Sequence, residues 1–351
     1  MSNKPKIIVV LTPGFPENEA DSTCLPAQQN FIKAVNKKFP GIRLIILSFQ
    51  YPFTKSVYNW HGNTVVAFGG RNKGKFHRLL LWQQIKQQLK KINKENSITG
   101  LLSFWCDECA FVAGSFAKKH QLTHYCWLLG QDVKEGNKYI NRTGKGKTSF
   151  IALSDFVSET FYKNYGITTA ATIPLGIAAD EFDQAGPNRD IDILAAGSLI
   201  PLKQYALFVK IIAAVKIKFP QVKAMLCGKG PQFKELQNMI ADLKLTENII
   251  LSGELPHKEL LAKMQRSKIF LHPSLYEGLG MVCLEALYAG CSVISFVQPV
   301  KTAITNWHIV NKQQEMIEKT KALMMEPPLP EKILPYAIEN TAISIMKLFD
   351  L

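Results

Sequence analysis

The stretch FLHPSLYEGLGMVCLEALYAGCSVISF, residues 270–296, decides the fold of the second half of the chain. An apolar run at 269–271, ended by Pro273, predicts a buried strand. The apolar residues of 282–288 recur at helical spacing and are followed by Gly290, which predicts a helix that ends there. A strand, a short turn and a helix in this order are typical of α/β proteins, in which ligands bind where the strands end.

Two carboxylates flank the turn, Glu277 at its entrance and Glu285 eight positions later. Gly278 and Gly280 would let main-chain N–H groups approach a ligand closely, and the positive end of the helix dipole would favour a diphosphate. Because a carboxylate repels a diphosphate, each glutamate suits such a ligand only if it meets hydroxyl donors: ribose hydroxyls for Glu285 and sugar hydroxyls for Glu277. The residues therefore predict a nucleotide-sugar site. The alternative is an ordinary strand, turn and helix with Glu285 on a solvated face.

Length and composition indicate a globular protein of two domains. The 351 residues exceed the usual size of a single core, and 47% are hydrophobic while 20% are charged. No run approaches the ~20 apolar residues that span a bilayer, and the run at 7–11 is interpreted as a first strand rather than a signal peptide. The seven cysteines are odd in number and mostly lie in apolar segments, which predicts reduced thiols in a cytoplasm.

The net charge of +14, from 42 basic and 28 acidic residues, favours anionic partners. The densest basic segment, 73–96, is interpreted as a surface helix packed on the N-terminal sheet, or as a patch that rests on anionic lipid headgroups or faces a phosphorylated acceptor. No nucleic-acid partner is expected, because no aromatic stacking platform accompanies the lysines. The apolar residues predicted to share one face of this helix are Leu79, Leu80, Trp82, Ile85, Leu89 and Ile92.

Strand-like runs alternate with helical stretches in two series, which predicts an α/β fold of two doubly wound, Rossmann-like domains facing each other across a cleft. The first series comprises 7–11, 44–48, 65–68, 101–104, 125–129 and 150–153; the second begins at 191 and continues with 223–227, 248–251, 269–271 and 292–296. The predicted parts are an N-terminal acceptor-side domain (1–174), a linker (175–190), a C-terminal donor domain (191–330) and a C-terminal helix (331–351) that can pack back on the N-terminal domain.

Two turns of the second domain are expected beside the glutamate pair, because they also follow strands. LAAGSLIPLKQY places Gly197 and Ser198 directly after a strand, with Lys203 in reach of a diphosphate. MLCGKGPQFKEL ends another strand in the segment 228–230, where the main chain can approach a nucleotide. A lone GxG is weak evidence, since many such turns serve packing alone.

The first domain contributes one candidate loop and one misleading motif. Gly14 lies in the loop after the first strand, and the next helix is expected to begin near Ser22 or Thr23. The segment NRTGKGKT, 141–148, ends like a phosphate-binding P-loop, but a strand follows it rather than a helix. No triphosphate site is therefore expected there.

No catalytic metal is expected. Asp190 and Asp192 form a DxD, yet they open a strand at the end of the sheet opposite the predicted site. Cys106 and Cys109 form a lone CxxC without a second pair or a nearby histidine. Neither group has the spacing of a metal centre.

Four segments together resemble the retaining GT-B glycosyltransferases, specifically the family 4 nucleotide-sugar transferases, also called glycosyl transferases group 1. TIPLGIAADEF (172–182) resembles the I-P-N-G-V-D-x-x-x-F linker of that family, and GSLIPLK (197–203) resembles its G-R-L-x-x-x-K. CGKGPQFKEL (227–236) resembles its G-x-G-P-x-x-x-x-L. PSLYEGLGMVCLEALYAGCSVI (273–294) resembles the E-x7-E element, the most specific of the four.

The resemblance implies a role for each matched position. Glu277 would contact the donor sugar and Glu285 the ribose, while Lys203 and the amides of 280–282 would bind the diphosphate. The implied catalytic residues are Lys203, Glu277 and Asp132. The implied donor-binding residues are Gly14, Gly197, Ser198, Gly228, Lys229, Gly230, Gly278, Leu279, Gly280, Met281, Val282 and Glu285.

The chain departs from the family pattern at several positions. Ser198 replaces an arginine, which removes one cation expected beside the diphosphate. In LLGQDV, Leu129 replaces a histidine, so Asp132 alone remains as an acceptor-side candidate. The segment 20–21, Ala-Asp, stands near the usual glycine pair, and the glycine-rich loop that usually follows Ser295 is absent.

The resemblance implies a retaining, metal-independent transfer of a hexosyl-type unit from a nucleoside-diphosphate sugar to a hydroxyl acceptor. It places such a chain in the synthesis of surface polysaccharides or lipid-linked glycans, in the cytoplasm and peripherally at the inner face of the membrane. The partners would be the nucleotide sugar and a glycan or glycolipid acceptor, with no cofactor. Two alternatives stay open: a catalytically impaired GT-B protein that binds nucleotide sugars or glycans, and an epimerase or phosphorylase of the same architecture.

Overall fold

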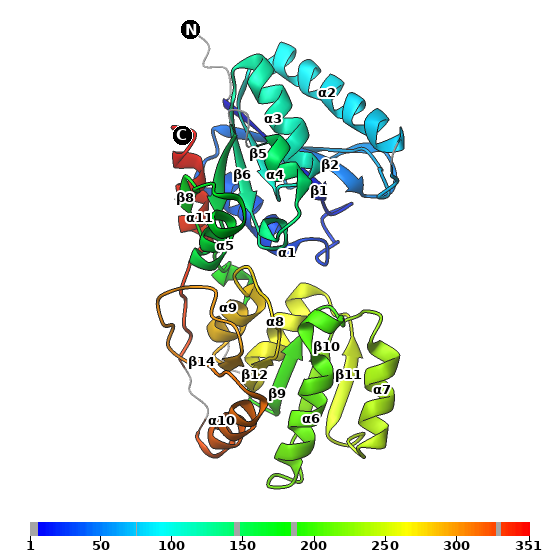
Figure 1. The fold of residues 1–351 in the computed structure, drawn as a ribbon, viewed down its shortest axis with the longest axis vertical. Coiled ribbons are helices and arrows are strands. Elements are labelled where there is room, and N and C mark those ends of the chain that lie inside the picture. Colours follow the sequence, from blue (N-terminus) through cyan, green and yellow to red (C-terminus); the bar gives the residue numbers. More distant parts are fainter. Residues whose placement is uncertain (1–5, 75, 144–147, 184–187, 328–330) are drawn as a thin grey trace. The chain divides into compact units, whose positions relative to one another are not determined.

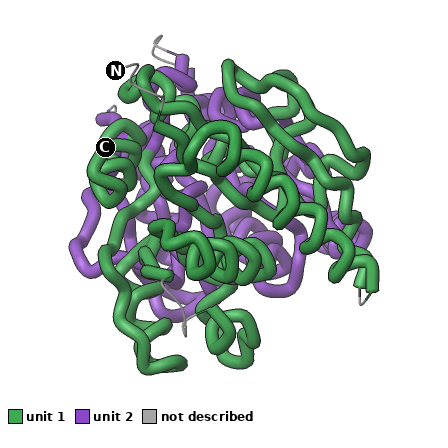
Figure 2. The backbone as a smooth tube through the Cα atoms, turned by 90° about the horizontal axis from the view of Figure 1, so that it is seen from above, with its two compact units in different colours: residues 1–176, 338–351 green, residues 177–337 purple. Residues whose placement is uncertain are grey.

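The structure, a computed structural model, describes residues 6–74, 76–143, 148–183, 188–327 and 331–351. The chain forms two compact units, Met1–Gly176 with Ile338–Leu351 and Ile177–Ala337 (Figure 2). Each unit is built on one largely parallel sheet with helices on both faces. The predicted α/β class with two Rossmann-like units is confirmed.

Unit 1 contains an eight-stranded sheet in the order β3-β4-β2-β1-β5-β6-β7-β8, in which β3 pairs antiparallel with β4 and the other pairs are parallel (Figure 1). Its strands are β1 (Lys6–Gly14), β2 (Ile42–Tyr51), β3 (Ser56–Trp60), β4 (Asn63–Ala67), β5 (Ile98–Phe104), β6 (Thr123–Leu128), β7 (Thr148–Ala152) and β8 (Ala171–Thr172). Its helices are α1 (Pro26–Lys38), α2 (Phe76–Asn96), α3 (Glu108–His120), η1 (Gln131–Val133), α4 (Lys138–Thr143), α5 (Asp155–Tyr165) and α11 (Ile338–Lys347).

The two faces of this sheet are covered by different helices. Along β1, Ile7, Val9 and Leu11 pack in one cluster with α2 and α3. Ile8 points to the opposite face, where it lies near Phe349 at the chain end. Side chains alternate between faces along a strand, so an uninterrupted apolar run is buried on both sides.

The end of the chain returns to unit 1. Helix α11 packs beside α1, and the Tyr125 hydroxyl donates to the Leu348 carbonyl at 3.0 Å. The chain therefore crosses from unit 1 to unit 2 after Gly176 and returns after Ala337. Beside these two crossings, the Ile177 amide donates to the Tyr336 carbonyl at 2.8 Å. From Ile177 onward, the described part of the predicted linker 175–190 belongs to unit 2.

Unit 2 contains a six-stranded parallel sheet in the order β11-β10-β9-β12-β13-β14 (Figure 1). Its strands are β9 (Ile191–Ala196), β10 (Ala224–Cys227), β11 (Ile249–Gly253), β12 (Ser267–His272), β13 (Ser292–Ser295) and β14 (Trp307–Ile309). Its helices are η2 (Ala179–Glu181), η3 (Pro201–Lys203), α6 (Tyr205–Lys216), α7 (Phe233–Asp242), α8 (His257–Gln265), α9 (Met281–Tyr288) and α10 (Gln313–Met325).

The strand order places a topological switch point between β9 and β12. From β9 the chain winds outward through β10 and β11, and then crosses to β12 on the other side. The loops after β9 and β12 therefore leave the sheet in opposite directions and open a crevice between them, which is where open α/β sheets bind ligands. The loop after β9 carries the predicted residues Gly197, Ser198 and Lys203, and the turn after β12 carries Glu277, Gly278 and Gly280.

Two helix predictions need correction. Helix α1 begins at Pro26, not near Ser22 or Thr23, because Leu25 adopts the left-handed conformation before it and proline suits the first helical turn. In α2 the buried residues are Leu81, Ile85, Leu89 and Ile92. Leu79 and Leu80 are 59% and 42% exposed, since they lie off the stripe that these four residues form.

Within the described residues, no helix combines the length and apolar character needed to cross a bilayer.

Candidate functional site

The turn between β12 and α9 leads directly into the first turn of a helix. Gly280 is the residue before α9 and has φ 72°, a left-handed conformation that favours glycine. The Cys283 amide bonds to the Gly280 carbonyl at 2.8 Å, so Met281 and Val282 occupy the helix positions whose N–H groups lack an intrahelical acceptor. Together with the helix dipole, amides at these positions would favour an anion.

Glu277 is held by two cationic or hydrogen-bonding side chains at this switch point. The Lys203 ammonium, from η3 after β9, forms an ion pair with Glu277 Oε1. His272 Nε2, at the end of β12, lies 2.7 Å from the same oxygen, and His272 is fully buried. Burial alone would raise the pKa of the Glu277 carboxyl, but His272 and Lys203 together lower that pKa to about 2. Glu277 is therefore ionised and fixed in position.

Glu285 lies one turn into α9 and is buried. His257 Nε2, on the first residue of α8, lies 2.8 Å from Glu285 Oε1. The predicted ribose-binding carboxylate is thus not on a solvated face. It is oriented by an imidazole from a helix 28 positions earlier in the chain.

Neither histidine was predicted from the sequence. His272 ends a buried strand one position before Pro273. A polar residue at the carboxyl end of a parallel strand is a signal from which it could have been predicted. His257 follows Pro256 at the start of an amphipathic helix and carries no comparable signal. Its role depends on the packing of α8 against α9.

The glycines after β9 and β10 allow the two loops to pack closely against each other. A Cβ on Gly228 would lie 1.9 Å from the Gly197 carbonyl oxygen, so no larger residue fits. The Gly197 amide bonds to the Cys227 carbonyl at 3.0 Å, and the Leu199 amide bonds to the Lys229 carbonyl at 2.9 Å. These contacts give Gly197, Gly228 and Gly230 a packing role beside the predicted contact with donor.

Among the loop cations, Lys203 and Lys229 have different surroundings. Lys203 is 19% exposed and faces Glu277, whereas Lys229 is 72% exposed and pairs with Glu254. Ser198, in place of the arginine of the family pattern, is exposed. The structure therefore brings Gly197, Lys203, Glu277 and the α9 N-terminus to one place in unit 2, while Lys229 is already neutralised in solvent.

Gly14 and Asp132 belong to unit 1. Asp132 is buried and accepts bonds from the amides of Cys106 (2.8 Å), Gly130 (2.9 Å) and Leu129 (3.1 Å). Burial raises the pKa of the Asp132 carboxyl, and these main-chain bonds oppose that rise. Asp132 thus anchors the loop after β6, and its predicted acceptor-side role stays a prediction. Gly14 ends β1 beside Tyr51.

The DxD carboxylates have partners at the opposite end of β9. Asp190 forms an ion pair with Arg266, and Asp192 Oδ1 lies 2.7 Å from the Lys268 ammonium. Residues 144–147 of the P-loop-like segment lie outside the described residues, and β7 follows them as predicted.

A family model matches the part of the chain that contains these loops. The model of the family "Glycosyl transferases group 1" matches residues 177–340. The gpi3 subunit of phosphatidylinositol N-acetylglucosaminyltransferase from Schizosaccharomyces pombe is 27% identical over 205 residues, which are 56% of this chain and 44% of that protein. A GDP-mannose-dependent phosphatidylinositol monomannoside mannosyltransferase of Mycolicibacterium smegmatis is 23% identical, over 44% of this chain and 46% of that protein. The chain spans less than half the length of these curated relatives.

Solved structures match over both units. HepE of Anabaena, in complex with UDP and glucose, has a TM-score of 0.76 at 14% identity, covering 98% of this chain and 99% of that chain. The pneumococcal O-GlcNAc transferase GtfA, in complex with UDP and GlcNAc, has a TM-score of 0.69 at 13% identity, covering 98% of both chains. The chain thus has the GT-B fold of these glycosyltransferases, and its residues 177–340 match the glycosyl transferases group 1 family.

Proposed function

We propose that this chain is a glycosyltransferase that moves a hexosyl-type unit from a nucleoside-diphosphate sugar to a hydroxyl acceptor, with retention at the anomeric carbon and without a metal. The observation that carries the proposal is the meeting of Lys203, Glu277 and the α9 N-terminus at the β9/β12 switch point. The family match of 177–340 supports the transferase class.

Each group has a task in this reaction. The bond between the anomeric carbon and the diphosphate breaks, so negative charge grows on the leaving diphosphate. Lys203 and the amides of Met281 and Val282 stabilise that charge. Glu277, kept ionised by His272 and Lys203, accepts hydrogen bonds from hydroxyl groups of the sugar. The acceptor proton passes to an oxygen of the departing diphosphate, so Asp132 is not required as a base.

The ribose of the donor would bond to Glu285, which His257 orients. Similar solved structures contain UDP with glucose or GlcNAc, so we propose UDP-glucose and UDP-GlcNAc as the first donors to test. We propose a glycan or glycolipid acceptor, in surface polysaccharide or lipid-linked glycan synthesis, at the cytoplasmic face of a membrane. The two phosphatidylinositol-directed relatives support a lipid-linked acceptor.

A second candidate function follows from Ser198. This exposed serine supplies no charge where the family pattern has arginine, and Lys203 and Lys229 are each paired with a glutamate. A chain with this site could bind nucleotide sugars without turnover. Donor binding across a panel of nucleotide sugars, with no product from any acceptor, would favour this candidate over the transferase.

The test measures transfer from radiolabelled UDP-glucose, UDP-GlcNAc and GDP-mannose to phosphatidylinositol and glycolipid acceptors, with and without a chelator. Lys203→Ala and Glu285→Ala should each reduce transfer at least about a hundredfold, because they remove a diphosphate cation and a ribose acceptor. Lys229→Ala, which alters an exposed pair, serves as the control, and thermal unfolding checks each fold. If both site variants transferred the sugar at the wild-type rate, the site assignment would be refuted. Loss of transfer on addition of the chelator would refute metal independence.

A further inference from the structure

The loops at the carboxyl ends of β9, β10, β11 and β12 carry no surplus of side-chain charge. They contain two lysines and two glutamates. Lys203 forms an ion pair with Glu277, and Lys229 forms one with Glu254. Ser198 contributes no charge where the family pattern has arginine. A diphosphate bound at these loops would therefore meet each lysine beside a carboxylate.

The two ion pairs differ in their exposure to water. The side chains of Lys229 and Glu254 are 72% and 40% exposed, so water and salt screen their charges. The side chains of Lys203 and Glu277 are only 19% and 13% exposed. Because little water screens this second pair, the carboxylate strongly offsets the charge of the neighbouring ammonium. Glu277 therefore removes much of the attraction that Lys203 would exert on a phosphate.

His272 holds the carboxylate of this pair in place. Its Nε2 atom lies 2.7 Å from Glu277 Oε1, and its ring is fully buried at the end of β12. Its Nδ1 atom has no hydrogen-bond partner among the described residues, so the ring proton belongs on Nε2, which donates it to Glu277. The flexible Lys203 side chain, in contrast, bonds only to Glu277 within the part of the chain that the structure describes. Of the two charged groups, the ammonium is the one that can turn towards a ligand.

The second oxygen of Glu277 is open to a sugar. Lys203 and His272 both bond to Oε1, whereas Oε2 has no partner among the described residues and is not sealed from solvent. Sugar hydroxyls that donate to Oε2 would stabilise the negative charge of Glu277 and so weaken its hold on Lys203. The sugar and the diphosphate of one donor would then bind cooperatively, since the first releases the cation that the second needs.

A free nucleoside diphosphate lacks this compensation. It has no sugar hydroxyls, and its terminal phosphate carries close to about two negative charges at neutral pH, compared with about one when a sugar is attached. The Glu277 carboxyl has a pKa of about 2 and is therefore ionised at neutral pH. The additional charge of the free diphosphate would be repelled by this carboxylate, while Lys203 stays bound to it.

We propose that the Lys203–Glu277 pair makes the site selective for the intact nucleotide sugar over the free nucleoside diphosphate that the reaction releases. Glu277 holds Lys203 until sugar hydroxyls reach its other oxygen, and it binds the ammonium again once the sugar has been transferred. The pair thereby favours departure of the product. The inference rests on the proposed function, because it needs a donor whose sugar lies beside Glu277.

The test measures dissociation constants by calorimetric titration of the full chain with UDP and UDP-glucose, UDP and UDP-GlcNAc, and GDP and GDP-mannose. For the pair that it accepts, the wild type should bind the intact donor about tenfold more tightly than the free diphosphate, the gain expected from hydrogen bonds to one charged group. Glu277→Gln removes the competing charge at nearly constant shape. It should bind the free diphosphate about tenfold more tightly than the wild type does, and the preference for the intact donor should disappear.

Two further variants show whether this gain arises through Lys203. In a Lys203→Gln background, Glu277→Gln should tighten the binding of the free diphosphate by less than about twofold, because the cation to be released is missing. Glu254→Gln is the matched control, since it removes the same charge from the exposed pair with Lys229. It should tighten that binding by less than about threefold. Thermal unfolding confirms that each variant is folded.

The outcomes separate this inference from the proposed function. If the wild type neither binds any of these nucleotides nor transfers sugar, both are overturned. If it transfers sugar but binds the free diphosphate as tightly as the intact donor, only the inference is overturned. An unchanged or weaker affinity of folded Glu277→Gln for the free diphosphate would also overturn it, because Glu277 would then position Lys203 for the phosphate. A gain that persists in the Lys203→Gln background would overturn the role of the lysine.

Discussion

The His257 imidazole lies 2.8 Å from the Glu285 carboxylate, both side chains being about nine-tenths buried. A carboxylate fixed in this way needs no reorganisation to accept hydrogen bonds from ribose hydroxyls. Under the proposed function, His257 would therefore be a positioning residue for the nucleotide.

We expect His257→Ala to weaken the binding of UDP, or of the best nucleoside diphosphate in a panel, by about tenfold, the loss from one charge-assisted hydrogen bond. Calorimetric titration measures the dissociation constant. In a Glu285→Ala background the same substitution should have little further effect, because the two residues act as a pair. Additive losses would show that His257 acts independently of Glu285.

The acid stability of the chain should depend on Glu277. Its pKa of about 2 in the folded protein lies below its ordinary value of 4.5, so its ionisation stabilises the fold above pH 4.5 and that contribution disappears as the pH falls towards 2. Between pH 6 and pH 3, the free energy of unfolding of Glu277→Gln should therefore fall by about 2 kcal/mol less than that of the wild type. Urea unfolding at the two pH values measures this difference. Parallel pH profiles would contradict the ion-pair assignment.

The two loop lysines should differ in their effect on catalysis. Lys203→Gln removes a cation that is largely shielded from water and should lower kcat about a hundredfold or more. Lys229→Gln breaks a solvent-exposed pair with Glu254 and should change kcat less than about threefold. Steady-state kinetics with a saturating donor measures both. Similar losses for the two variants would mean that Lys229 leaves Glu254 to bind the diphosphate.

Ser198 stands where the family pattern has an arginine, so Ser198→Arg tests what that missing cation would contribute. Because Ser198 is exposed at the end of β9, Ser198→Arg can be accommodated without burying a charge. We expect it to tighten the binding of a nucleoside diphosphate by about fivefold to tenfold, as a charge-assisted bond to phosphate would. Ser198→Gln is the uncharged control of comparable length. An equal gain with glutamine would show that charge is not the cause.

The loop after β10 should tolerate no side chain at Gly228. Gly228→Ala brings a Cβ within 1.9 Å of the Gly197 carbonyl oxygen, so the loops after β9 and β10 must separate. We expect the free energy of unfolding to fall by about 2 kcal/mol or more. Gly41→Ala, where a Cβ would meet no atom within 4 Å, should change it by less than about 0.5 kcal/mol. Denaturant unfolding compares the two, and a stable Gly228→Ala chain would mean that the loops are not packed as described.

Much of the fold could be predicted from local patterns. The buried apolar runs of β1, β2, β9 and β12 were predicted as strands, because central parallel strands are apolar on both faces. The short edge strands β8 and β14 were not, because two or three residues contain no detectable periodicity. The exposed Leu79 and Leu80 were misplaced because a helix with many apolar residues fits more than one face until its neighbours are known.

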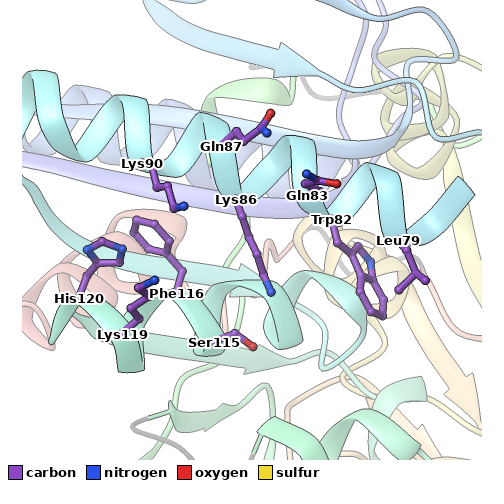
Figure 3. A pocket seen from close by; sticks show the side chains of 10 residues that line it. All are labelled: Leu79, Trp82, Gln83, Lys86, Gln87, Lys90, Ser115, Phe116, Lys119 and His120. Carbon is purple, nitrogen blue, oxygen red and sulfur yellow. The ribbon is translucent and has the colours of Figure 1, made fainter. Parts of the chain in front are cut away.

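The sequence by itself determined the turn before α9 and the spacing of Glu277 and Glu285, because both depend on residues that are neighbours along the chain. Only the tertiary structure decided their partners. Lys203 reaches Glu277 across 74 positions because β9 and β12 are adjacent in the sheet, and His257 reaches Glu285 because α8 packs against α9. A pocket between α2 and α3 (Figure 3) likewise exists only because two helices from separate crossovers lie side by side. Strand order and helix packing join residues that are distant in sequence, and local periodicity does not contain that information.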